Sequence, residues 1–147
     1  MIRKEVIVDT NALLIPGEFG VDIFEELERL GYVHIIVPKK VLTELDMLRQ
    51  RPGVKGKEKI AANVGYSLIR KYTDTSEHER MPTGCTISIS IEEGEKGEGG
   101  TDEMIAALAM KRKAAVLTND EELRTRLSQA GIVTVYLRGR NRLEESD

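Results

Sequence analysis

Residues 6–14 read VIVDTNALL, a short apolar run that ends at Asp9 and continues into a helical turn. A run that is apolar at every position, rather than at every second one, is typical of a strand buried on both faces of a parallel sheet. Apolar runs of this kind also occur at 33–37 (VHIIV) and 114–117 (AAVL). We therefore place these three strands at the centre of a parallel sheet, with Asp9 at the carboxyl end of the first.

Two further strands alternate apolar and polar residues, as strands with one buried face do. Residues 85–91 (CTISISI) place their isoleucines on one face, and residues 133–137 (VTVYL) alternate in the same way. We assign these two strands to the edges of the sheet. With strands numbered in chain order, the predicted strand order is 3-2-1-4-5.

That order reverses direction between strands 1 and 4. Open α/β sheets bind ligands at the carboxyl ends of the strands beside such a reversal. Asp9 ends strand 1 and Asp120 lies just beyond strand 4. We expect both carboxylates to reach the same crevice.

Helical patterns fill the intervals between the strands, at 22–30, 39–49, 57–72, 102–112 and 121–130. Three of these helices have apolar residues at helical spacing, namely Val41, Leu45 and Leu48; Ile60, Val64 and Leu68; and Ile105, Leu108 and Ala109. Gly31 and Gly131 are expected to end the first and last helices. Strands that alternate with helices predict a doubly wound α/β sheet with helices on both faces. We see no repeat or linker, so residues 1–147 form one domain.

The composition excludes several classes of protein. The 147 residues are 40% hydrophobic and 32% charged, with 22 Lys and Arg against 25 Asp and Glu, which disfavours a disordered chain or a wholly basic nucleic-acid coat. A single cysteine, Cys85, excludes an internal disulfide, and with only His34 and His78 a Cys or His zinc centre is excluded too. Any metal must therefore be bound by oxygen. We find no signal peptide or membrane span and expect a cytoplasmic protein.

Four acidic residues each have a plain structural interpretation. Asp9 and Asp120 are suitable helix N-caps or turn residues. Asp102 lies in the first turn of a helix, where the macrodipole favours an acid and Thr101 would be the N-cap. Glu44 lies beside the apolar face of its helix, and a lone glutamate there is usually solvated.

Taken together, these acids suggest a functional site. Acids that converge at strand ends, without histidine or cysteine, form an oxygen cage suited to Mg²⁺ or Mn²⁺. Such ions turn bound water into a nucleophile and stabilise the anionic transition state of phosphodiester cleavage.

The sequences VDTNALL, VLTELDML, TDEMIAALA and LTNDEEL resemble, in order and type, the four acidic motifs of the PIN-domain nucleases. The resemblance covers almost the whole chain. It implies metal-dependent cleavage of single-stranded or structured RNA, with catalytic and metal-binding roles for Asp9, Glu44, Asp102 and Asp120 and supporting roles for Asn11 and Thr118. Asp46 and Glu103, beside two of these acids, leave the choice of ligand open. The C-terminal sequence is more similar to the ribosomal RNA-processing branch than to the toxin branch, although the cysteine-rich zinc ribbon of some rRNA-processing members is absent.

Basic residues cluster at three places. Residues 49–59 follow the helix that contains Glu44, and we expect Arg49, Arg51, Lys55 and Lys57 to contact RNA phosphates. Lys111 to Lys113 more simply complement a helix dipole, and Arg138, Arg140 and Arg142 follow the last strand. The glycine-rich segment 92–100 contains acids that would repel phosphate, so we interpret it as a flank of the acidic site.

Several alternatives stay open at this point. The chain could be an endonuclease of rRNA maturation, a toxin-type RNase, or a catalytically silent RNA-binding assembly factor. An aspartyl-phosphate enzyme or a receiver domain that uses Asp9 is disfavoured, because Asn11 replaces the second acid of a phosphatase motif and no lysine follows strand 4 near Thr118. A homodimer is also left open.

Overall fold

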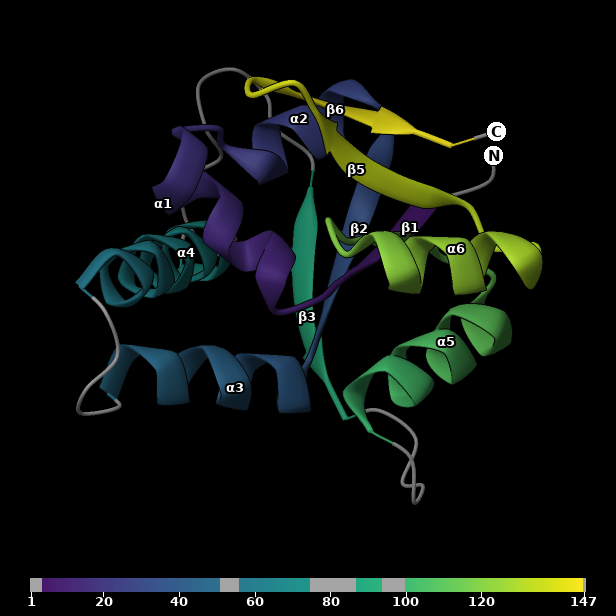
Figure 1. Cartoon of the computed structure of the whole chain (residues 1–147), viewed down its shortest axis with the longest axis horizontal. Coiled ribbons are helices and arrows are strands. Elements are labelled where there is room, and N and C mark those ends of the chain that lie inside the picture. The colour runs from purple at the N-terminus through teal and green to yellow at the C-terminus, as the bar shows by residue number, and fades with distance from the viewer. Residues whose placement is uncertain (1–3, 51–55, 75–86, 94–99, 147) are drawn as a thin grey trace.

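A computed structural model describes residues 4–50, 56–74, 87–93 and 100–146. Helices pack around one six-stranded sheet (Figure 1). The strands are β1 (Lys4–Val8), β2 (Tyr32–Pro38), β3 (Ser88–Glu92), β4 (Ala115–Leu117), β5 (Thr134–Arg138) and β6 (Arg142–Glu145). The helices are the 3₁₀ helix η1 (Asn11–Leu14), α1 (Ile15–Phe19), α2 (Ile23–Arg29), α3 (Lys39–Gln50), α4 (Gly56–Asp74), α5 (Thr101–Arg112) and α6 (Glu121–Gln129).

The sheet has the order β3-β2-β1-β4-β5-β6, and its first five strands are parallel. This confirms the predicted α/β class and the 3-2-1-4-5 order. Helices α3 and α4 lie toward the β2 and β3 side of the sheet, and α5 and α6 lie toward the β4 and β5 side (Figure 1). The reversal of strand order next to β1 therefore lies between the two groups of helices.

The prediction that β5 is an edge strand is wrong. Strand β6 pairs antiparallel with β5, so the sheet is mixed and has six strands. The chain turns back at Gly139, which adopts a φ of 67° that favours glycine, and it buries Leu143 completely. Strand β6 is not predicted from the sequence, because Leu143 is the only apolar residue in its sequence, RLEE.

The central strands are buried as predicted. In β1, β2 and β4 the side chains of Val6, Ile7, Ile35, Ile36 and Val116 are fully inaccessible to solvent. A strand buried on both faces must be apolar at successive positions, which is the pattern that the sequence shows. This rigid centre fixes the ends of β1 and β4, where the acidic residues begin.

The predicted apolar face of α4 is wrong at Ile60 and Val64, while Leu68 packs against the core as predicted. Ile60 is 62% exposed and Val64 is 36% exposed, whereas the buried face consists of Ala61, Ala62, Gly65 and Ile69. A Cβ atom on Gly65 would lie 2.1 Å from the carbonyl oxygen of Leu13, so only glycine permits this approach of α4 to η1. Small residues, rather than the largest apolar ones, therefore form the contact that positions the segment after Asp9.

Some predictions fall outside the described residues. They concern the proposed phosphate contacts Arg51 and Lys55, the core role of Cys85, and positions 94–99 of the glycine-rich segment. Within the described part of the chain, no helix is both long and apolar enough to cross a membrane.

Candidate active site

Asp9 lies at the carboxyl end of β1 and is 95% buried, with 5% of its surface exposed. Its Oδ1 accepts a hydrogen bond from the backbone N–H of Ala12 at 2.9 Å, and its Oδ2 accepts one from the Thr118 hydroxyl at 2.6 Å. The first bond satisfies an N–H at the start of η1, which is the structural role expected of a turn aspartate. The second bond fixes the carboxylate toward the end of β4.

Thr118 links Asp9 to Asp120. Its hydroxyl oxygen also accepts a hydrogen bond from the backbone N–H of Asp120 at 3.1 Å. Asp120 is the N-cap of α6, because its Oδ1 accepts from the N–H groups of Glu122 and Leu123. The capping role expected from the sequence is thus present, and it anchors Asp120 beside Asp9.

Asn11 ties the same two loops together from the other side. Its Oδ1 accepts a hydrogen bond from the backbone N–H of Asn119 at 3.2 Å, and Asn119 in turn accepts from Leu137 in β5. The loops after β1 and β4 are therefore cross-linked to each other and to β5. Asn11 and Thr118 both position the acidic loops.

Glu44 comes from α3, and both of its oxygens accept hydrogen bonds from threonines. Thr10 donates to Oε1 at 2.6 Å and Thr101 donates to Oε2 at 2.8 Å. The expectation that Thr101 caps α5 is wrong, because Gly100 is the N-cap and makes no side-chain cap. The Thr101 hydroxyl reaches Glu44 instead, which joins α3 to the start of α5.

Thr10 and Thr101 are partners of Glu44 that the sequence alone does not predict. Each threonine directly precedes or follows an acid of the site, since Thr10 follows Asp9 and Thr101 precedes Asp102. The only sequence feature that points to these bonds is a threonine next to each of two candidate acids. The sequence does not show that both hydroxyls donate to Glu44, because this depends on how α3 packs against the two loops.

The electrostatics place the acids within reach of one another. The pKa of Asp9 is raised to about 6, mainly by burial and to a smaller extent by the negative charges of Asp102 and Asp120, against hydrogen bonds from Thr118 and Ala12 that lower it. Burial also raises the pKa of Asp102, and the charges of Asp120 and Glu44 act in the same direction. Asp9, Glu44, Asp102 and Asp120 therefore form one cluster at the carboxyl edge of the sheet.

The neighbouring acids are paired differently. Asp46 accepts a hydrogen bond from Arg49 at 2.7 Å, and Glu103 forms an ion pair with Arg126 at 3.3 Å. Their charges are already balanced by an arginine, while the partners of Glu44 are neutral hydroxyls. This difference favours Glu44 over Asp46 as a member of the site. Arg126 forms its ion pair with Glu103 and acts on Asp102 only through its charge, which favours Asp102 over Glu103.

Of the predicted phosphate contacts, the structure describes Arg49 and Lys57. Arg49 is half-buried, donates to Asp46 and Asn63, and stacks on Tyr66 with 3.8 Å between its Cζ and the ring centroid. Its guanidinium thus connects α3 to α4. Lys57 is exposed in the first turn of α4.

The four acids supply the type of ligand that a divalent cation prefers. Among the described residues, no three His, Cys, Asp or Glu side chains are arranged as they stand to bind a metal ion. Asp9 and Glu44 are oriented instead by the hydroxyl donors described above. The four carboxylates are nevertheless hard oxygen ligands. Burial, and to a smaller extent their mutual repulsion, raises the pKa values of Asp9 and Asp102, and a Mg²⁺ or Mn²⁺ ion would balance the charge of both carboxylates.

A sequence model of the PIN like domain matches residues 6–140, which span both ends of the acidic cluster. The chain belongs to the PIN-like domain family. This membership is consistent with the order of the four acidic motifs along the chain, and it favours a nuclease over the aspartyl-phosphate alternatives.

The PIN-like domain is similar to Ribonuclease VapC9 of Archaeoglobus fulgidus, with 27% identity over 132 residues that cover 90% of this chain and 82% of the relative. Two solved structures share its fold. The PIN domain endonuclease Utp24 matches with a TM-score of 0.64 and 19% identity, covering 97% of this chain and 90% of Utp24. A domain of a functionally unknown protein from Methanocaldococcus jannaschii matches with a TM-score of 0.58 and 23% identity, covering 92% of both chains.

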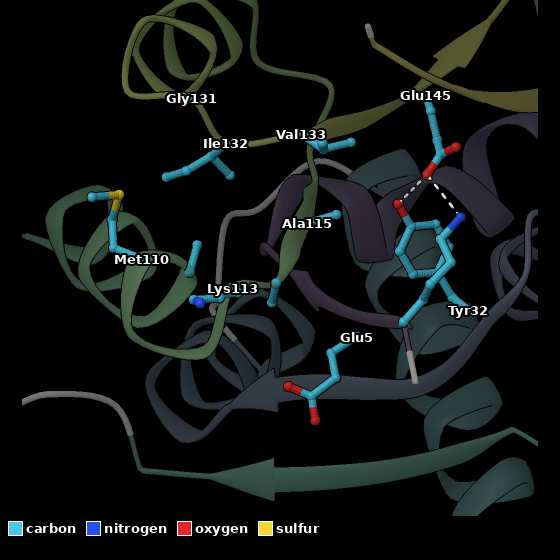
Figure 2. Close-up of a pocket in the computed structure, with 12 residues that line it drawn as sticks. Glu5, Tyr32, Met110, Lys113, Ala115, Gly131, Ile132, Val133 and Glu145 are labelled. Atoms are coloured by element: carbon cyan, nitrogen blue, oxygen red, sulfur yellow. Dashed lines mark hydrogen bonds and ion pairs between the residues drawn. The ribbon is translucent and has the colours of Figure 1, made fainter. Parts of the chain in front are cut away.

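The PIN-like domain has a pocket at the amino-terminal end of its strands, opposite the acidic cluster (Figure 2). This pocket of about 350 Å³ lies where β1, β4 and β5 begin, and Met110 and Ile132 line it. At its rim Glu145 accepts hydrogen bonds from Tyr32 and from Lys4. These contacts fasten β6 to β1 and β2, so we assign them to the closure of the sheet rather than to the acidic site.

Proposed function

We propose that this chain is a divalent-metal-dependent endoribonuclease that hydrolyses RNA phosphodiester bonds at the carboxyl edge of its sheet. The observation that carries the proposal is the buried carboxylate of Asp9, whose pKa is raised by burial and by two neighbouring aspartates. Such uncompensated acids are costly unless a cation balances them. The ribonuclease and endonuclease names of two similar proteins support this assignment.

Asp9, Glu44, Asp102 and Asp120 are the residues that would bind the ion. When bound, the ion lowers the pKa of a water molecule and balances the negative charge of the transition state. Thr118 keeps the Asp9 carboxylate directed toward Asp120, and the capping bonds of Asp120 fix the start of α6. Thr10 and Thr101 keep Glu44 turned toward the same edge.

We place processing of ribosomal RNA first among the biological roles, because the C-terminal sequence is most similar to that branch. A toxin-type RNase and a catalytically silent RNA-binding factor are the alternatives. The presence of all four acids in one cluster argues against the silent alternative. Binding of Mn²⁺ without RNA cleavage would favour it.

The test is cleavage of fluorescently labelled single-stranded and structured RNA by the purified protein with Mn²⁺, with Mg²⁺ and with excess chelator. We expect cleavage only with a divalent ion and a loss of at least about a hundredfold in Asp9→Asn. Glu18→Gln is the matched control, because it removes one exposed carboxylate from α1. Equal cleavage by Asp9→Asn, or undiminished cleavage in chelator, would refute the proposal.

A further inference from the structure

Arg124 lies one helical turn after Asp120 on α6, and its guanidinium stacks on the ring of Tyr136. The distance from its Cζ to the ring centroid is 3.8 Å, which is close for a cation–π contact. Stacking fixes the plane of the guanidinium before any ligand arrives. The side chain is thus pre-organised at little further entropic cost.

Arg124 has no anionic partner among the described residues. Its Nε is buried and lacks a hydrogen bond there, and no ion pair forms with Glu121 although that residue lies three positions earlier. Six other described arginines pair with carboxylates, namely Arg29, Arg49, Arg112, Arg126, Arg138 and Arg142. Arg70 and Arg140, which form no ion pair among the described residues, are exposed to solvent, whereas Arg124 is half-buried. A half-buried guanidinium without an anion is costly, which is a sign of a site built for one.

The surroundings of Arg124 form an open groove of about 550 Å³ between α6 and the start of β5. Hydroxyl and amide groups line it, from Thr125, Ser128, Gln129 and Ser146. The Thr125 hydroxyl already donates to the backbone oxygen of Glu121, while hydroxyl and amide groups such as those of Ser128, Gln129 and Ser146 are able to donate hydrogen bonds to anionic oxygens without adding charge. Glu121 lies at the end of the groove nearest Asp120, so the positive part of the groove begins one turn further along α6.

We propose that Arg124 and this groove bind a phosphodiester group of the RNA, next to the bond that is cleaved. This inference rests on the proposed ribonuclease function. A planar guanidinium donates two parallel hydrogen bonds to a phosphate, which an ammonium cannot do. One helical turn separates Arg124 from Asp120, about 6 Å along the helix axis, so a neighbouring phosphate of the same strand reaches it. The groove therefore sets the direction in which the strand leaves the acidic site.

The test measures the affinity of a labelled single-stranded RNA for the Asp9→Asn protein, which binds without cutting, at several salt concentrations and constant Mg²⁺. Adding Arg124→Gln should weaken binding about tenfold and reduce the slope of log affinity against log salt by about 0.7, because one phosphate contact is lost. Arg124→Lys should recover only part of the affinity. Tyr136→Leu should weaken binding and Tyr136→Phe should not, since only the ring supports the stack.

Arg70→Gln is the charge-matched control, because Arg70 is exposed and lies on a different helix, α4. We expect it to change the affinity less than about twofold. If Arg124→Gln leaves affinity and salt slope unchanged, or matches Arg70→Gln, the inference is wrong while the ribonuclease function stands. If the wild type does not cleave RNA and Asp9→Asn does not bind it, the proposed function fails and the inference fails with it. Circular dichroism checks that each variant is folded. If Arg124→Gln does not fold, the affinities of Arg124→Lys and Tyr136→Leu test the inference in its place.

Discussion

At the scale of single residues, the site depends on hydroxyl groups whose hydrogen-bond partners cannot be predicted from the sequence. Thr10 and Thr101 each donate to one oxygen of Glu44, and Thr118 donates to Asp9. Such bonds set the rotamer of a carboxylate without neutralising its charge. The acids could be predicted from their order along the chain, but the direction of a threonine hydroxyl follows from packing between distant elements.

Thr101→Val tests this arrangement, because valine keeps the shape and removes the donor to Glu44. Loss of a residue that orients a metal ligand typically weakens metal binding about tenfold or more. We expect that change in Mn²⁺ affinity, measured by calorimetry, with affinity restored in Thr101→Ser. Thr43→Val is the control, since the Thr43 hydroxyl bonds to the backbone of its own helix. Equal Mn²⁺ affinity of Thr101→Val and wild type would show that the hydroxyl does not position Glu44.

Asp9 predicts how stability depends on pH. Because its folded pKa of about 6 lies above the ordinary value of 3.8, the folded state holds the proton more tightly, and the stabilisation from this group is lost as pH rises through about 6. In chelator, Asp9→Asn should therefore gain stability relative to wild type between pH 4 and pH 8, by up to about 3 kcal/mol. Urea denaturation at several pH values measures this difference. A difference that does not change with pH would mean that Asp9 titrates normally.

At the scale of elements, the strands and main helices could be predicted because their burial follows a simple period. Val6 to Val8 are buried on both faces, and Ile105 and Leu108 lie on the inner side of α5 as expected. Strand β6 could not be predicted from one buried leucine in four residues. The prediction that Ile60 and Val64 are buried in α4 is wrong, because it follows hydrophobic size alone. The close packing of α4 requires small residues at the contact instead.

Gly65→Ala tests that contact. Its Cβ would lie 2.1 Å from the Leu13 carbonyl oxygen, a backbone atom that cannot move freely, so we expect a loss of at least about 2 kcal/mol in the free energy of unfolding. Gly56→Ala at the start of the same helix meets nothing within 4 Å and should be neutral or slightly stabilising. Urea denaturation compares the two variants. Equal stabilities would mean that α4 and η1 move apart easily.

At the scale of the whole molecule, the acidic cluster draws on elements that are distant in sequence. Asp9 follows β1, Glu44 lies in α3, Asp102 lies in the first turn of α5 and Asp120 precedes α6. The parallel strand order brings these four points to one edge, and the contacts of Glu145 close the opposite edge. The unfavourable free energy of bringing four carboxylates together is thus offset by the stability of the complete fold.

An ion that relieves this crowding should therefore stabilise the entire domain. A ligand at one hundred times its dissociation constant adds about 2.7 kcal/mol to the free energy of unfolding. For a chain of this size that raises Tm by roughly 5 to 10 °C, which differential scanning calorimetry with Mn²⁺ measures.

Two controls separate specific binding from screening. The rise of Tm should be absent in Asp120→Asn, which lacks one ligand, and in K⁺ at matched ionic strength, which screens charge without binding to the oxygen cage. An equal rise of Tm in K⁺ would show that Mn²⁺ acts only by screening, and an equal rise in Asp120→Asn would show that its carboxylate is not a ligand. Since unfolding separates all four acids, a specific rise would link metal binding to the strand order itself.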